Sequence, residues 1–370
     1  MADRLRVGVI GRTGKGNYGH GIDTVWGEVP ETEVVAVADE HEAGRRDVQK
    51  RTKAANAYAD YREMLAKERL QIVAIGPRWI DQHREMAIAA AEHGCHIYME
   101  KPFVPTPGHA DDVIRACEMR HIKLALAHQT HYAPTAILAK KLIADGQIGE
   151  VLELRGRGKE DQRGGGEDLW VLGSHVLDLM RFFAGDALDC YATVSAKGQP
   201  ITAADIAEGN EGVGWLAGDA VQARYTFARG IIGSFSSVRG QGGNPSRFGL
   251  QILGSRGVLE IGTGYPAPVW ILKDPAWSPG RSGATWQAVS SNGIGQPETI
   301  KASGLHAGNV AAVQDLLEAI KNDRQPACSM YDGRAVVEMI SAVFASQRTG
   351  KPVRFPLVER GNPLAAIKTP

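Results

Sequence analysis

Short apolar runs alternate with helical patterns over the first third of the chain. Five runs rich in apolar and β-branched residues have the length of buried strands: residues 6–10, 34–38, 72–75, 96–99 and 123–127. Between them, residues 60–70 and 84–92 repeat apolar positions at helical spacing, and Asp60 followed by Glu63 is typical of a helix start. Strand, helix, strand units in series predict a doubly wound α/β domain around a parallel sheet.

The pattern changes beyond about residue 128. Strand-like runs separated by glycine-containing turns predict a large, mostly antiparallel sheet: residues 151–154, 221–227, 231–237, 250–253 and 258–261. Apolar positions at helical spacing over residues 309–321 and 334–344 predict two late amphipathic helices. We therefore expect an α/β domain over residues 1–128 and an α+β domain over residues 129–370.

Composition narrows the class of ligand. The chain has 370 residues, with 42 basic and 42 acidic side chains and a formal net charge of zero. This balance argues against nucleic acid or an anionic membrane as the main partner, so a small molecule is expected. The four cysteines form no C-x-x-C pair, and no apolar run reaches about 18 residues. These features predict a reduced, cytoplasmic protein without a metal site.

Glycines follow the first predicted strand in the segment VGVIGRTGKGNYG. Set against G-x-G-x-x-G, Gly11 and Gly16 occupy the first and third places, whereas Thr13 stands at the second, where a side chain crowds a pyrophosphate. We expect the loop to open into a helix whose N-terminus, with Gly11, Arg12, Thr13 and Gly16, receives a dinucleotide. The first domain is then a Rossmann dinucleotide-binding domain. The alternative is an ordinary glycine-rich turn.

An acidic residue ends the second predicted strand. Asp39 lies 39 − 16 = 23 residues after Gly16, near the separation at which an acid binds both ribose hydroxyls of NAD. Its charge, reinforced by Glu40 and Glu42, repels the additional phosphate of NADP, so the expected cofactor is NAD. The alternative is a solvated acidic turn.

The fifth predicted strand ends in Met99-Glu100-Lys101-Pro102-Phe103, which places a lysine at the carboxyl end of a parallel strand. The proline after it can take the cis form and aim the lysine into the crevice. The segment EMAIAAAEHGCHIYMEKPF resembles the signature region of the glucose-fructose oxidoreductase, inositol dehydrogenase and MocA (Gfo/Idh/MocA) family. The likeness extends to KLIADGQIGEV, GSHVLDLM, ILGSRGVLEI and the terminal SMYDGRAVVEMISAVFASQRTGKPVRFPL, and so covers nearly the whole chain.

The resemblance implies a Rossmann domain followed by an α+β domain whose sheet supports a homodimer or homotetramer. It implies that Lys101 points at the reacting carbinol, between substrate and nicotinamide, with Glu100 on the cofactor side. Pro77 and His83 match cofactor-binding positions after the fourth strand. The GPRWIDQH turn is about two residues longer than in relatives, so Arg78 and Trp79 are expected to project toward substrate, or Trp79 is a surface or core aromatic.

A second catalytic position lies in Gly173-Ser174-His175-Val176-Leu177-Asp178, which matches the family's G-x-H-x-x-D segment. His175 suits the transfer of a hydroxyl proton near neutral pH, and Asp178 either orients its ring or caps a helix. The alternative for His175 is a satisfied core histidine. Relatives carry an aspartate at the position of Val171, so Glu167 or Asp168 supplies that carboxylate, or the carboxylate is missing.

Further polar residues are expected around a substrate. The charged segment 159–163, ending in Arg163, precedes a triple glycine, and His131 with Tyr132 stands where relatives show an Arg-Phe pair. Predicted substrate contacts are Trp79, Lys101, His131, Arg163, Asp168 and His175. A charge run is also typical of a solvated loop.

These features predict an NAD-dependent oxidoreductase that acts on a secondary hydroxyl of a sugar, glycoside or cyclic polyol, or reduces the ketone. Two alternatives remain. In the first, transient oxidation of a sugar carbon allows elimination of the glycosidic group before the hydride returns. In the second, the protein is a non-catalytic dinucleotide and sugar-binding regulator, although the intact Lys101 and His175 argue against it.

Overall fold

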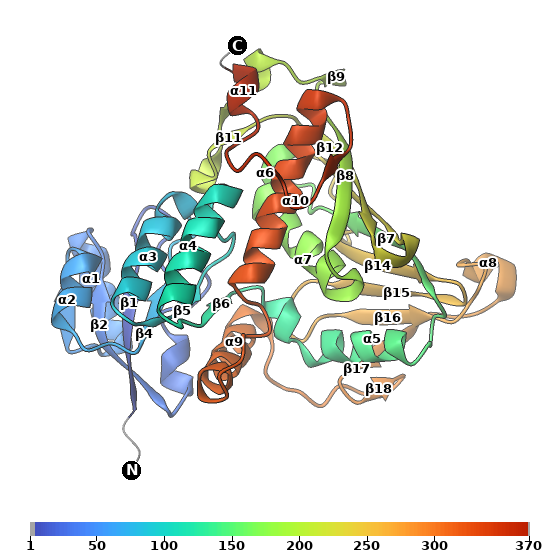
Figure 1. Cartoon of the computed structure of the whole chain (residues 1–370). Helices are drawn as coiled ribbons and strands as arrows, with labels where there is room; N and C mark the ends of the chain where they lie inside the picture. Colours follow the sequence, from blue (N-terminus) through green and yellow to red (C-terminus); the bar gives the residue numbers. More distant parts are fainter. Residues whose placement is uncertain (1–3, 369–370) are drawn as a thin grey trace. The chain divides into compact units, whose positions relative to one another are not determined.

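The computed structural model describes residues 4–368, which form two compact units (Figure 1). The first unit contains the described chain through Gln129 together with residues 210–213 and Leu305–Arg334, and the second contains the rest. This division differs from a single boundary after residue 128, because most of helix α9 (Gly304–Lys321) groups with the first unit. Asn309 of α9 accepts hydrogen bonds from Tyr98 Oη at 2.8 Å and Gln129 Nε2 at 2.9 Å, which ties α9 to that unit.

The first unit contains a parallel sheet, as predicted, and this sheet has six strands. In spatial order its strands are β3 (Asn56–Tyr58), β2 (Thr32–Ala38), β1 (Leu5–Ile10), β4 (Ile72–Ile75), β5 (His96–Met99) and β6 (Leu124–Leu126). Strand β4 and the last four residues of β1 are buried on both faces, which explains why these stretches carry no charged residue. Strand β3 escaped prediction because its three residues are only partly buried.

Four α-helices accompany this sheet: α1 (Glu42–Thr52), α2 (Tyr61–Lys67), α3 (His83–Glu92) and α4 (Pro107–Met119). Helix α2 begins as its sequence predicts, because Asp60 accepts a hydrogen bond from the backbone N–H of Arg62. Helices α3 and α4 lie side by side (Figure 1). Helix α1 buries little more than Val48 and therefore carries a weak apolar pattern.

The glycine-rich segment after β1 does not open into a helix, which corrects the prediction from sequence. Turns occupy residues 13–24, and a short 3-10 helix, η1 (Val25–Glu28), follows. Asn17, Gly16, Gly19 and Gly21 have φ values of 54°, 83°, 60° and 90°, which are incompatible with an α-helix. The helix N-terminus expected to receive a pyrophosphate is therefore missing here.

The second unit is built on an eleven-stranded sheet. In spatial order the strands are β18 (Gly293–Ile294), β17 (Gln287–Ser290), β16 (Val269–Leu272), β15 (Gly257–Gly262), β14 (Gly249–Gly254), β7 (Val151–Arg157), β13 (Ile232–Val238), β12 (Ala220–Phe227), β8 (Ala187–Ala196) and β19 (Val353–Arg354), with β9 (Gln199–Pro200) beside β8. All neighbours are antiparallel except β7 and β13, which confirms a mostly antiparallel sheet.

Helices cover one face of this sheet. They are α5 (Pro134–Ala144), α6 (Gly166–Val171), α7 (Gly173–Ala184) and the later part of α10 (Met330–Thr349), with short helices α8 (Pro279–Ser282) and α11 (Ala365–Lys368) elsewhere. Helix α7 packs against β7, β13 and β14. Two short strands, β10 (Ala207–Glu208) and β11 (Trp215–Leu216), pair separately.

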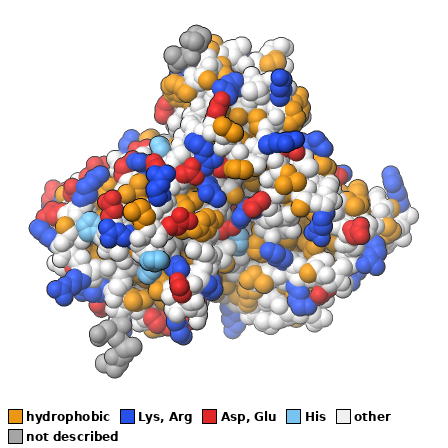
Figure 2. All heavy atoms as spheres, viewed as in Figure 1, with side chains coloured by type: hydrophobic (Ala, Val, Ile, Leu, Met, Phe, Trp, Pro, Cys, Tyr) orange, Lys and Arg blue, Asp and Glu red, His pale blue; other side chains and the backbone are white. Residues whose placement is uncertain are grey.

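The surface carries both signs of charge. In the view of Figure 2, acidic and basic side chains are interspersed, as the balanced composition predicts. Among the described residues, no helix has the length and apolarity needed to cross a bilayer.

Candidate functional site

Lys101 directly follows β5, at the edge of the parallel sheet where open α/β folds bind their ligands. It is 5% exposed, and its peptide bond to Pro102 is cis. The neighbouring Glu100 is fully buried, and its Oε2 accepts a hydrogen bond from the backbone N–H of Lys101 at 3.0 Å. Strand β5 therefore ends in a buried lysine whose backbone is held by a carboxylate.

The other oxygen of Glu100 holds the glycine-rich segment. Oε1 accepts a hydrogen bond from the backbone N–H of His20 at 2.9 Å and lies 2.6 Å from His20 Nδ1. A Cβ at Gly19 would overlap this carboxylate, so the close approach requires glycine. Burial raises the pKa of Glu100, but the hydrogen bonds from His20 and the charges of His20 and Lys101 outweigh it and leave the pKa lowered. Glu100 is a charged bridge between the loop and Lys101.

Replacing Glu100 with glutamine should reduce the free energy of unfolding by about 2 to 3 kcal/mol at neutral pH, because one end of the amide is a donor and leaves a buried N–H without an acceptor. Since folding lowers the pKa of Glu100, its contribution is present above the ordinary value of 4.5 and is lost as the pH falls through the lower folded value. Urea unfolding of the wild type and the variant at neutral and acidic pH measures the difference in their free energies of unfolding. If this difference in the free energy of unfolding were as large in acid as at neutral pH, the conclusion that Glu100 is charged in the folded protein would be wrong.

His83 and Pro77 hold two loops together. The His83 ring is fully buried, with Nδ1 2.9 Å from the carbonyl oxygen of Phe103 and Nε2 2.8 Å from that of Pro77. Burial lowers the pKa of His83, and the two carbonyl acceptors act in the opposite direction. Both ring nitrogens are used inside the protein, so His83 positions the segments before α3 and after Lys101. Cofactor contact by His83 and Pro77 stays a prediction.

A cavity of about 280 Å³ opens beyond the carboxyl ends of β1 and β2. Its lining combines apolar, aromatic and charged residues, among them Gly11, Arg12, Asp39, Glu40, Asp60, Tyr61, Arg62 and Met86. The volume is just below the range of about 300 to 1,000 Å³ that is usual for ligand pockets, so the cavity is too small for a whole dinucleotide. The predicted residues Gly11, Arg12 and Asp39 therefore meet at one cavity.

The carboxylate of Asp39 accepts hydrogen bonds from the glycine-rich segment itself. Oδ2 accepts hydrogen bonds from Thr13 Oγ1 and Tyr18 Oη, both at 2.7 Å, and from the backbone N–H of Thr13 at 3.0 Å. Oδ1 accepts one from the backbone N–H of His41 at 2.9 Å. A carboxylate offers about four acceptor positions, so ribose hydroxyls would have to replace some of these contacts. Thr13, the departure from the glycine pattern, is thus a partner of Asp39.

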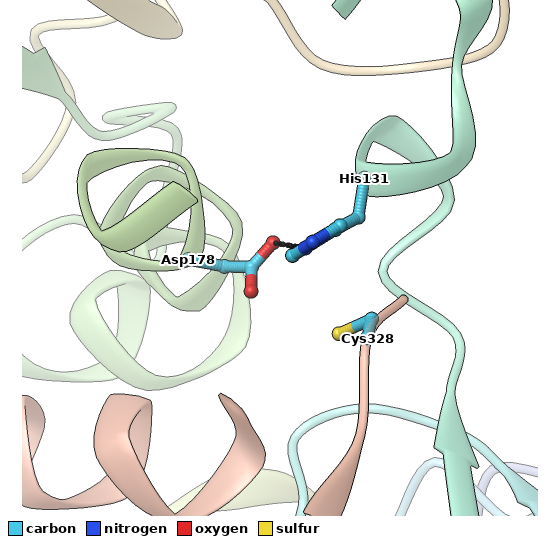
Figure 3. A group of neighbouring side chains, drawn as sticks. All are labelled: His131, Asp178 and Cys328. Atoms are coloured by element: carbon cyan, nitrogen blue, oxygen red, sulfur yellow. Dashed lines mark hydrogen bonds and ion pairs between the residues drawn. The ribbon is translucent and has the colours of Figure 1, made fainter. Parts of the chain in front are cut away.

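His175 is half-buried in the first turn of α7. Asp178, one turn later, lies with its Oδ2 3.2 Å from Nδ1 of His131 (Figure 3). His131 is buried, and its ring meets Phe182 edge-on with centroids 4.6 Å apart. His131 is thus a partner of Asp178 that the sequence analysis did not predict. The orientation of His175 by Asp178 stays a prediction.

Asp168 is fully buried in α6, and its Oδ2 accepts hydrogen bonds from Ser237 Oγ and from the backbone N–H of Glu160, the latter at 3.1 Å. Burial raises the pKa of Asp168, although these hydrogen bonds act in the opposite direction. Asp168 therefore holds the turn after β7. Substrate contact by Asp168 stays a prediction. Val171 is buried, and Glu167 is partly exposed in the first turn of α6.

Arg163 forms a two-point ion pair with Asp161, at 2.6 Å between Nη2 and Oδ2 and 3.1 Å between Nε and Oδ1. The pair lowers the pKa of Asp161 to about 2. Trp79 is half-buried, with Lys15 Nζ 4.0 Å from the centre of its ring. Substrate contacts by Trp79, His131 and Arg163 stay predictions.

Two family models match the chain and cover most of it. Residues 5–128 match the NAD-binding Rossmann fold of the Gfo/Idh/MocA oxidoreductase family, and residues 140–355 match the C-terminal alpha/beta domain of the same family. The chain belongs to the Gfo/Idh/MocA family. Its parallel sheet is therefore an NAD(P)-binding Rossmann sheet.

Curated relatives within the Gfo/Idh/MocA family are distant. The chain is 26% identical to levoglucosan dehydrogenase of Pseudarthrobacter phenanthrenivorans over 55% of this chain and 58% of that protein. It is 23% identical to D-apiose dehydrogenase of Paraburkholderia graminis over 91% of this chain and 87% of that protein. A solved structure of levoglucosan dehydrogenase with NADH and levoglucosan superposes with a TM-score of 0.75 at 21% identity, covering 96% of this chain and all of that one. Sugar dehydrogenases are thus among its relatives.

The resemblance to the Gfo/Idh/MocA family predicted roles for Glu100 and Lys101, but it did not predict the residues that support the site. These residues are His20, Tyr18 and Asn309. His20 and Tyr18 belong to the same glycine-rich segment, where a helix was expected, and a tyrosine facing a buried aspartate has no spacing signature. Asn309 donates to the carbonyl oxygen of His20 at 2.9 Å across 289 positions of sequence, a separation that periodicity cannot detect.

Proposed function

We propose that the protein is an NAD-dependent dehydrogenase that oxidises a secondary hydroxyl of a sugar, glycoside or cyclic polyol, or reduces the corresponding ketone. Membership of the Gfo/Idh/MocA family supports oxidoreductase chemistry, and the distant sugar dehydrogenases support the substrate class. The observation that carries the proposal is the burial of Lys101 at the carboxyl end of β5, on the edge of the sheet that binds dinucleotides.

The residues at this edge fit a dinucleotide. The 280 Å³ cavity at the ends of β1 and β2 is proposed to receive a nucleoside, which Gly11 and Asp39 would hold, with Arg12 in its wall. Three carboxylates line the cavity, Asp39, Glu40 and Asp60, against two arginines. Their charge disfavours the additional phosphate of NADP, so NAD is the proposed cofactor. When bound, NAD supplies the hydride acceptor.

In the proposed reaction, two side chains act on the substrate hydroxyl. His175 accepts its proton as a general base, and the ammonium of Lys101 stabilises the alkoxide that develops as the hydride leaves. Burial of Lys101 strengthens this stabilisation, because a charge acts more strongly where water is excluded. Glu100 positions Lys101 through its backbone N–H. His131 and Arg163 are proposed to contact the other substrate hydroxyls.

A panel assay tests both the cofactor and the substrate class. The enzyme is mixed with NAD or NADP and with levoglucosan, D-apiose, myo-inositol and a set of pyranosides, and reduced nicotinamide is followed by absorbance. We expect turnover with at least one carbohydrate and a preference for NAD of about tenfold or more, since a charge repulsion of about 1.4 kcal/mol gives that ratio. A preference for NADP would contradict the proposal that Asp39, Glu40 and Asp60 in the cavity wall disfavour its additional phosphate.

A further inference from the structure

The glycine-rich segment is closed by its own hydrogen bonds. Arg12 and Asn17 exchange two backbone hydrogen bonds, each 3.0 Å long, and close a tight turn. The N–H of Thr13 donates to Asp39, and that of Gly14 donates to Asn17 Oδ1 at 3.0 Å. A Rossmann phosphate site ordinarily offers free N–H groups at a helix start, whereas here these N–H groups already have acceptors. Cationic side chains beside the turn are then a further source of contacts for a phosphate.

The closed turn packs against the segment that follows β4. A Cβ at Gly16 would overlap the backbone of Arg78, so the two chains touch at a position that only glycine allows. Lys15 Nζ lies 4.0 Å from the ring centre of Trp79, and Arg12 Nη1 donates to Asp81 Oδ1 at 2.8 Å. The segment after β4 therefore packs Arg78 against Gly16, Trp79 against Lys15 and Asp81 against Arg12.

Two of these cations retain unused hydrogen-bonding capacity. Arg12 is only 7% exposed, and its Nε is buried without a hydrogen-bond partner among residues 4–368. The Nε of Arg78 is buried in the same condition. A buried guanidinium N–H without an acceptor destabilises the folded protein, unless a bound ligand provides the acceptor. Arg12 also lines the nucleoside cavity, so the cavity and the cations match a ligand that joins a nucleoside to phosphate.

We propose that the side chains of Arg12, Lys15 and Arg78 bind the phosphate groups of the dinucleotide, in place of the helix N-terminus that this chain lacks. Guanidinium groups suit the role because they bind phosphate oxygens through paired, charge-assisted hydrogen bonds. The inference rests on the proposed dinucleotide-dependent function and adds the groups that recognise the phosphates.

The test compares ligands with and without phosphate. Affinities for ADP and for adenosine are measured by displacement of NADH, whose fluorescence reports binding without turnover. Arg12→Gln and Arg78→Gln should each weaken ADP binding about tenfold or more and adenosine binding less than about threefold, since a hydrogen bond to a charged group contributes about 1.5 to 3 kcal/mol. Lys15→Gln should lower ADP affinity selectively by a smaller factor.

The matched control is Arg115→Gln, which removes an exposed arginine of α4 that pairs with Asp112 and does not line the cavity. Its ratio of ADP to adenosine affinity should stay within about twofold of the wild type. Unchanged ratios in the Arg12 and Arg78 variants, or an equal change in the control, would overturn the inference. If Arg12→Gln fails to fold, the variants of Arg78 and Lys15, whose side chains are partly exposed, test the inference in its place. Wild-type protein that binds neither NADH nor ADP would instead refute the proposed function.

Discussion

Replacing Lys101 with methionine should lower kcat by about a thousandfold or more while leaving the affinity for NADH within about threefold of the wild type. Methionine keeps most of the apolar stem and removes the ammonium, so the side chain still fills its buried place beside Glu100. The loss falls on the transition state, because the alkoxide charge that the ammonium stabilises develops only there. Stopped-flow or steady-state formation of NADH measures kcat, and fluorescence titration measures affinity.

The control for this variant is Lys67→Met. Lys67 is an exposed lysine on α2 that pairs with Glu63, and removing it should leave both quantities near wild type. Thermal unfolding of all three proteins verifies that the folds are intact. Turnover by Lys101→Met within about tenfold of wild type would remove Lys101 from the chemistry and leave it as a positioning or binding residue.

Replacing His175 with glutamine should lower kcat by about a hundredfold to ten-thousandfold, the usual contribution of a general base. A base must be deprotonated to accept the hydroxyl proton, so the wild-type rate should fall on the acidic side. The residual rate of the variant should lack that fall or shift it. A pH series of kcat for both proteins measures this effect, which a merely structural role of His175 would not produce.

His93→Gln provides the comparison for this second variant. His93 is exposed at the end of α3, where its Nδ1 lies 2.9 Å from the carbonyl oxygen of Ala89. Its rate and pH profile should match the wild type. A His175 variant with the full wild-type rate, or with an unchanged acidic limb, would contradict the assignment of His175 as the base.

Much of the fold was predictable because burial leaves a local record in the sequence. Strand β4 and the later residues of β1 and β5 are enclosed on both faces, so these stretches are apolar and easily recognised. Helix α1 and strand β3 leave weaker records, since few of their side chains are buried. The grouping of α9 with the first unit was not predictable, because Asn309 meets Tyr98 across 211 positions of sequence.

The candidate site was predictable in its residue types more than in its contacts. The position of Lys101 followed from the strand before it and from family resemblance. The glycine-rich segment misled, because positive φ at Gly16, Asn17 and Gly19 turns it away from a helix, and Thr13 and Tyr18 commit Asp39 to internal hydrogen bonds. Which acceptor a buried donor selects depends on tertiary packing, and spacing alone does not record it.

The most direct measurement counts the equivalents of NADH formed per enzyme molecule with the best carbohydrate of the panel. A dehydrogenase that exchanges its cofactor forms NADH in proportion to substrate, far beyond one equivalent, with the matching ketone detected by mass spectrometry. That is the expected result. Formation that stops at one equivalent while glycoside is cleaved, or binding of NAD and sugar without any NADH, would contradict net oxidation and favour a closed redox cycle or a regulator.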